Sequence, residues 1–129
     1  MFQIRNNHFI DGSGRVALLR GVNLSGATKL PCIPDGATWN PAGFQDAVNV
    51  SFIGRPFPLA EADEHFSRLR AWGLTFLRFL VTWEAIEHAG PGLYDEAYLD
   101  YLYAVVKKAA DYDICLFIDP HQDCWSRFT

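Results

Sequence analysis

The segment Asp119-Pro120-His121-Gln122-Asp123 places several chemically capable groups directly behind an apolar run. If an extended backbone continues past Pro120, Asp119, His121 and Asp123 all face one side. Carboxylate and imidazole ligands suit a divalent metal. The same groups also suit a sugar site, in which Asp123 accepts hydrogen bonds from hydroxyls and His121 donates to a substrate or a catalytic group. A third interpretation is a loop stabilised by Asp and His capping bonds. The sequence lacks the His-x-His pair of many metal-dependent barrel hydrolases, which disfavours the metal.

Arg78 lies inside the apolar run 74–81, "LTFLRFLV". A charge in such a run is costly unless it is paired. One interpretation is a structural ion pair with a carboxylate from a later strand. The other is an arginine that keeps a catalytic carboxylate ionised by lying beside it. The residue types alone leave both open.

Three apolar runs and two periodic segments would have to position these groups. Residues 74–81 and 114–119 are nearly continuous in apolar side chains, which is typical of strands covered on both faces. Residues 11–14, "DGSG", predict a turn between two β-prone runs, the second at 16–23. Helices are expected at 60–72, ended by Gly73, and at 95–111, capped by Asp95. Their buried stripes are predicted as Ala62, Phe66, Leu69 and Trp72, and as Leu99, Leu102, Val106 and Ala110.

Residues 25–58 show no helical or strand period and hold five of the seven prolines. Loops of this length are usually functional or disordered. The segment keeps four aromatic residues, so we expect an ordered loop with an apolar face. The alternative is a self-packed surface loop that binds nothing. The aromatic residues are Trp39, Phe44, Phe52 and Phe57.

The element order β-α-β-α-β predicts parallel strands with right-handed crossovers, an α/β fold. No Gly-x-Gly-x-x-Gly follows a strand, so a dinucleotide-binding fold lacks its fingerprint. Polar groups instead follow successive strands, as in an α/β barrel: Asn23, then Trp83 and Glu84, then His121 and Asp123. Eight strand–helix units need roughly 250 residues. We therefore expect residues 1–129 to be the N-terminal part of a larger catalytic barrel, truncated after its third strand.

Several other polar and aromatic residues carry weaker signals. Trp39, Trp83 and Trp125 could stack on sugar faces, although most tryptophans belong to the core. Glu87 is expected to be a solvated helix residue. We interpret the remaining histidines, His8, His65 and His88, as structural.

The composition excludes several classes of protein. Half of the residues are hydrophobic and 15% are aromatic, which argues against a disordered chain. The net charge of −4, without a basic stripe, makes nucleic acid an unexpected partner. The odd count of three cysteines predicts reduced thiols in an intracellular protein. The N-terminus shows no secretory signal, and the most apolar window is too short to span a membrane.

Three segments together resemble glycoside hydrolase family 5, in its endoglycoceramidase-related branch of fungal glucosylceramidases and steryl β-glucosidases. The segments are "HFIDGSGRVALLRGVNLSGATKLP", "LTFLRFLVTWEAIEHAGPGLYDEAYLDYL" and "FIDPHQDCWSRFT". The resemblance covers nearly the whole chain and is vaguest in residues 31–58. It implies a (β/α)8 TIM barrel and retaining hydrolysis of the β-glucosidic bond to a sterol or ceramide. No metal or organic cofactor is implied.

The resemblance also implies roles for individual residues. The family's two catalytic glutamates follow strands 4 and 7, so neither falls within residues 1–129 and this fragment alone is expected to be inactive. Arg78 matches an arginine beside the nucleophile, and His121 matches an active-site histidine. Lys29 and Asp123 match contacts to glucose hydroxyls, and Asn23 and Trp83 match positions lining the cleft. This favours the sugar interpretation of the Asp119–Asp123 segment.

Two other classes remain open: a non-catalytic truncated product, and a metal-dependent barrel hydrolase that uses Asp119, His121 and Asp123. The absent signal predicts a cytoplasmic or vacuolar protein. For a glycolipid enzyme it also leaves peripheral membrane contact open.

Overall fold

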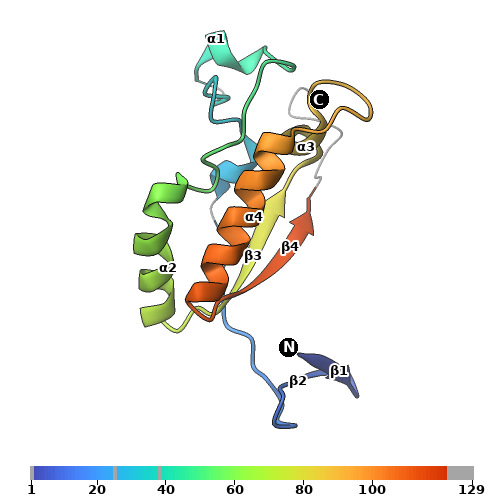
Figure 1. Ribbon diagram of the computed structural model, residues 1–129, viewed down its shortest axis with the longest axis vertical. Helices are drawn as coiled ribbons and strands as arrows, with labels where there is room; N and C mark the ends of the chain where they lie inside the picture. The colour runs from blue at the N-terminus through green and yellow to red at the C-terminus, as the bar shows by residue number, and fades with distance from the viewer. Residues whose placement is uncertain (1, 25, 38, 122–129) are drawn as a thin grey trace.

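The computed structural model describes residues 2–24, 26–37 and 39–121. Its centre is a parallel pair of strands, β3 (Phe76–Val81) and β4 (Cys115–Pro120), with α2 (Ala62–Ala71) and α4 (Glu96–Asp111) covering one face (Figure 1). The short helix α3 (Trp83–Glu87) follows β3 directly. The core consists of apolar side chains between β3, the two long helices and the 25–58 loop. The chain therefore has an α/β fold, as predicted.

The β-prone run predicted at 16–23 pairs with β3 only through its C-terminal residues. Phe76 N donates to Arg20 O at 3.0 Å, Arg78 N donates to Val22 O at 3.0 Å, and Leu24 N donates to Arg78 O at 2.8 Å. This is a parallel ladder, so the spatial order is residues 20–24, then β3, then β4. Gly21 explains how close the segment runs, because a Cβ there would stand 1.3 Å from the Phe76 carbonyl oxygen. The parallel order is confirmed, and a strand over the whole of 16–23 is not formed.

The N-terminus forms an antiparallel hairpin, β1 (Gln3–Arg5) and β2 (His8–Ile10), near the amino ends of β3 and β4 (Figure 1). Its turn is made by Asn6 and Asn7, at φ of 50° and 62°. Asparagine tolerates this left-handed region, which two-residue hairpin turns require. The sequence interpretation missed this turn. The turn predicted at 11–14 also forms, with Gly14 N donating to Asp11 O at 3.0 Å.

Helix α2 follows the single turn η2 (Leu59–Glu61) and ends where predicted, at Gly73 with φ of 75°. Ala62 and Phe66 are fully buried, and Leu69 packs against the core. Trp72, predicted to be buried, is 67% exposed. It is the C-cap residue, so it lies past the last turn that faces the core.

Helix α4 begins as predicted, with Asp95 Oδ1 accepting from Tyr98 N at 2.9 Å. Its predicted buried face is wrong by one position. The residues that are buried are Tyr98, Tyr101, Val105 and Ala109, whereas Ala110 is exposed. A tyrosine can be buried where its hydroxyl finds a hydrogen-bond partner. Tyr101 does so by donating its hydroxyl to Phe57 O at 2.5 Å.

Strand β4 is less buried than the apolar run predicted, with Phe117 52% exposed and Ile118 38% exposed. Among the described residues β4 is the edge strand of the parallel sheet, next to β3. Helix α4 covers one of its faces (Figure 1). Strand β3, which has a neighbour on each side, is almost entirely buried, as predicted.

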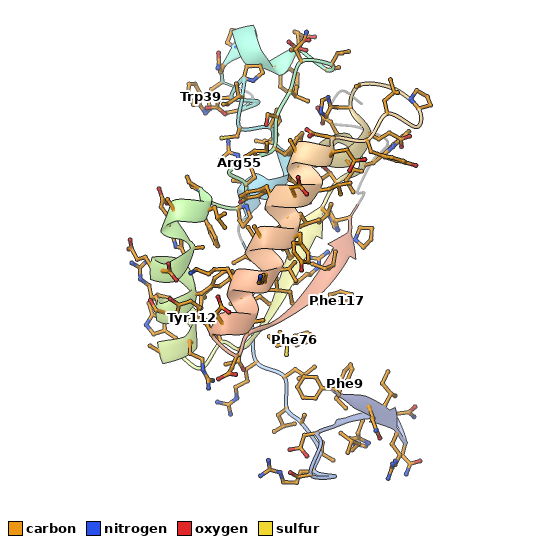
Figure 2. All side chains as sticks on the ribbon, in the orientation of Figure 1. Phe9, Trp39, Arg55, Phe76, Tyr112 and Phe117 are labelled. Atoms are coloured by element: carbon orange, nitrogen blue, oxygen red, sulfur yellow. The ribbon has the colours of Figure 1, made fainter. Side chains whose placement is uncertain are left out.

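The 25–58 loop is ordered in its described parts. It contains η1 (Gly26–Lys29) and α1 (Pro41–Phe44), and Ser51 N donates to Ile33 O at 2.6 Å. Phe52 and Phe57 are core residues, so the predicted apolar face is confirmed. Trp39 does the opposite: it is 78% exposed and lies beside α1, away from α4 and the strands (Figure 2).

Candidate functional site

Arg78 of β3 is paired with Asp119 of β4. Its Nε and Nη2 atoms lie 2.8 and 2.6 Å from the same carboxylate oxygen, Asp119 Oδ2. The Arg78 side chain is 37% exposed and that of Asp119 is 19% exposed. The interpretation of Arg78 as half of an ion pair with a later strand is therefore confirmed. Whether it also lies beside a catalytic carboxylate stays a prediction.

His121 joins this pair from the end of β4. Its backbone N donates to Val81 O at 2.9 Å, so the ladder with β3 continues past Pro120. Its Nδ1 lies 2.9 Å from Arg78 Nη2 and 3.1 Å from Asp119 Oδ2. Asp119 and His121 therefore do face one side, as the alternate spacing predicted.

Asn23 completes the group from the first parallel segment, accepting from Arg78 Nη1 through Oδ1 at 3.3 Å. We call Asn23, Arg78, Asp119 and His121 the Arg78 cluster. Its members come from three adjacent parallel segments, in the order 20–24, β3, β4. Of the predicted residues, the structure brings together Asn23, Arg78, Asp119 and His121, with Asp119 as the acceptor between Arg78 and His121.

Two roles are open to Nδ1 of His121. A guanidinium only donates hydrogen bonds, so Nδ1 accepts if it bonds Arg78 Nη2, and the ring hydrogen is then on Nε2. If Nδ1 carries the hydrogen instead, it donates to Asp119 Oδ2. The first arrangement is the one in which His121 can donate a hydrogen bond from Nε2.

Trp83 is held by Glu87, one turn further along α3. The helix starts at once after β3, because Thr82 Oγ1 caps it by accepting from Ala85 N at 3.2 Å. The indole Nε1 donates to Glu87 Oε2, and the backbone N of Gly92 donates to Glu87 Oε1. The Gly92 amide, and then the Trp83 indole, hold the pKa of Glu87 below its usual value. Glu87 lies on α3, as predicted, and its ionised carboxylate is a clamp for Trp83.

The remaining predicted residues are Lys29, Asp123 and Trp125. Lys29 ends η1, which follows the 20–24 segment and packs against β3, and its side chain is half-buried. Asp123 and Trp125 lie outside the described residues. Within residues 2–24, 26–37 and 39–121, no group of three or more His, Cys, Asp or Glu side chains could hold a metal ion. In the same part of the chain, no helix is long and apolar enough to cross a membrane.

A separate cavity of about 290 Å³ lies between α2 and the first parallel segment. Its lining comes from 22–24, 56–57 and α2, and it includes Val22, Leu69 and Trp72. Of the Arg78 cluster, only Asn23 touches it. We therefore do not count this cavity as part of the candidate site.

Comparison with known proteins defines the class of this chain. Residues 34–128 match the model of the cellulase family, glycosyl hydrolase family 5. The chain belongs to glycosyl hydrolase family 5.

Individual relatives have more specific names than the family. The chain is 56% identical to a glucosylceramidase of Rhizopus delemar over 94% of its own length and 18% of that protein's. It is 40% identical to the ergosteryl-beta-glucosidase of Saccharomyces cerevisiae over 96% of its own length and 17% of the other's. The crystal structure of Cryptococcus neoformans sterylglucosidase 1 superposes with a TM-score of 0.88 at 47% identity, covering 95% of this chain and 17% of that one. The chain thus spans less than a fifth of these relatives.

Proposed function

We propose that this chain forms the N-terminal part of a (β/α)8-barrel β-glucosidase that hydrolyses the O-glycosidic bond of glycolipids. The observation that carries the proposal is identity of 40–56% to proteins named as glucosylceramidases and an ergosteryl-beta-glucosidase. The substrates we propose are steryl β-glucoside and glucosylceramide. The Arg78 cluster supports the same conclusion, because Arg78, from within β3, contacts Asp119 and His121 at the carboxyl end of β4, the end at which barrel enzymes bind their substrates.

In this proposal, the reaction proceeds with retention and two glutamates beyond residue 129 act as acid/base and nucleophile. Retaining enzymes hold such a pair roughly 5 Å apart. Arg78 would lie beside the nucleophile and keep it ionised. The contacts of Arg78 within the described residues use Nε, Nη2 and one hydrogen of Nη1, so a second Nη1 hydrogen can serve that carboxylate. Because both glutamates come from elsewhere, residues 1–129 alone would be inactive.

The remaining residues would hold the glucose. His121 donates through Nε2 to a substrate hydroxyl or to the nucleophile, while Lys29 and Asp123 contact other hydroxyls. Asn23 and the exposed face of Trp83 line the cleft. The Trp83 side chain is 47% exposed while Glu87 holds its indole nitrogen, which supports a role in stacking on a sugar.

A sugar site also accounts for the Arg78 cluster better than a metal site does. The Asp119 oxygen that a metal would need lies 2.6 Å from a guanidinium nitrogen. A cation bound there would have to displace a positive charge that cannot deprotonate. We therefore propose that the Arg78 cluster itself holds no metal.

The test is glucose release by the complete enzyme from steryl β-glucoside and glucosylceramide, measured with and without a chelator. The proposal predicts hydrolysis of at least one of the two glycolipids and no effect of the chelator. Loss of activity on chelation would support a metal-dependent hydrolase instead. Activity on cellulose fragments without activity on either glycolipid would refute the glycolipid assignment while leaving the family intact.

A further inference from the structure

His88 connects the end of α3 with the start of α4 and with the distant 25–58 loop. It follows α3, and its Nδ1 lies 2.8 Å from the carbonyl oxygen of Val48, forty residues earlier in the 25–58 loop. Its Nε2 lies 3.1 Å from Oδ2 of Asp95, the N-cap residue of α4. The two side chains are only 13% and 16% exposed. His88 therefore has two defined partners, which agrees with its interpretation as a structural residue.

Both partners of His88 are hydrogen-bond acceptors. A backbone carbonyl oxygen can only accept, and so can an ionised carboxylate. Each ring nitrogen must then carry a hydrogen, which only the imidazolium form provides. A neutral ring has one N–H and must leave one acceptor without a donor. This differs from His121, where a guanidinium donor faces one of the nitrogens.

Acidic groups on the three segments that His88 joins have partners of different kinds. On the loop, Asp46 accepts through Oδ1 from the backbone N of Val48 and Asn49, at 3.0 and 2.8 Å. On α3, Glu87 binds Gly92 and Trp83. Asp95 uses Oδ1 to cap α4, which leaves Oδ2 for the ring. Among the described residues, the hydrogen bonds of the ring are thus to one carboxylate, from α4, and to one carbonyl, from the loop.

The two contacts would not be lost equally when the ring loses a proton. A hydrogen bond to a carboxylate is stronger than one to a neutral carbonyl, so the remaining hydrogen would stay on Nε2, facing Asp95. The corner between α3 and α4 also keeps its own bond, Asp95 N to Ile86 O at 2.8 Å. The contact that disappears is the one to Val48, which ties the loop to this corner.

We propose that His88 is a positioning residue whose proton latches residues 46–50 of the 25–58 loop onto the α3–α4 corner. With both nitrogens protonated the loop is held, and deprotonation at higher pH releases it. The corner begins four residues after Trp83 and includes its clamp, Glu87, so the latch fixes the loop next to the proposed cleft. That consequence for catalysis rests on the proposed glycolipid function; the latch itself does not.

The test is amide hydrogen exchange in the complete protein at pH 5.5 and pH 8, corrected for intrinsic rates and read in peptides covering residues 46–51. In the wild type we expect exchange to be about tenfold faster at the higher pH, the effect of losing one hydrogen bond of typical strength. In His88→Gln it should be fast at both values. His8→Gln is the matched control, because within the described residues the hydrogen bond of the His8 ring stays in its own hairpin, to Asn6 O at 2.7 Å. It should behave as the wild type does.

Two results would overturn the latch: equal protection of residues 46–51 at both pH values in the wild type, or wild-type protection in His88→Gln. If His88→Gln does not fold, the wild-type pH series decides alone. A second readout is KM for steryl β-glucoside, which should rise with pH in the wild type more than in His88→Gln. If the enzyme does not act on glycolipids, the KM readout is lost. Hydrogen exchange still tests the latch, because it needs no substrate.

Discussion

Replacing Asp119 tests the contact on which the Arg78 cluster depends. Two guanidinium nitrogens of Arg78 reach one oxygen of Asp119, at 2.8 and 2.6 Å, and His121 Nδ1 lies 3.1 Å from it. Asp119→Leu removes that acceptor and leaves the Arg78 charge without its partner. Breaking a fully buried pair in this way costs about 3–5 kcal/mol. Because the Arg78 side chain is 37% exposed, water recovers part of this, and we expect a loss of about 2 kcal/mol.

The assay is urea unfolding of Arg78→Met, Asp119→Leu and the double variant of the complete protein. The double variant leaves no unpaired charge, so the coupling energy should be about 1.5–2 kcal/mol. The control cycle uses Arg68 and Glu64, an ion pair on the surface of α2 whose side chains are 46% and 67% exposed. Exposed pairs of this kind couple by roughly 0.5 kcal/mol or less. Equal coupling in the two cycles would refute the reasoning.

Three further predictions concern the aromatic residues of the 25–58 loop, Tyr101 and Glu87. If Trp39 and Phe44 help hold the lipid aglycone, substituting both by alanine should weaken activity on lipid substrates more than on a soluble aryl glucoside; equal losses would exclude that role. Tyr101→Phe removes the donor to a buried carbonyl and should lower the free energy of unfolding by about 1–2 kcal/mol, whereas no change would mean that water satisfies that oxygen. The lowered pKa of Glu87 means that its clamp on Trp83 is fully present above its usual value of 4.5 and is lost as the pH falls through the lower folded value. Trp83 fluorescence, taken as the difference from Trp83→Phe, should therefore change in acid, and Glu87→Gln should lack that transition.

Much of the architecture could be predicted because it depends on local patterns. The run 74–81 is apolar throughout because β3 has a neighbour on each side, and Asp95 and Gly73 mark helix ends through their own backbone preferences. Polar residues directly after such runs predicted which end of the strands would carry the site. Two of the three residues predicted from "DPHQD", Asp119 and His121, do lie together.

Contacts set by register could not be predicted from the sequence. Arg78 was expected to pair with some later carboxylate, but only the alignment of β3 with β4 identifies Asp119, forty-one residues away. The buried face of α4 was misplaced because Tyr98 and Tyr101 pack deeper than their polarity suggested. The partners of His88 could not be predicted for a related reason: one of them is a loop carbonyl, and no residue type in the sequence signals such an acceptor.

The most direct test of the central claim is the rate of glucose release from steryl β-glucoside by the complete enzyme and by its Arg78→Lys variant. Lysine keeps the charge but cannot donate to Asp119, His121 and a catalytic carboxylate in one plane. We predict hydrolysis by the wild type and a loss of at least about 100-fold in kcat/KM for the variant, corresponding to roughly 2.7 kcal/mol of transition-state stabilisation. A wild-type rate in a folded Arg78→Lys variant, or no hydrolysis of any glycolipid by the wild type, would contradict the account.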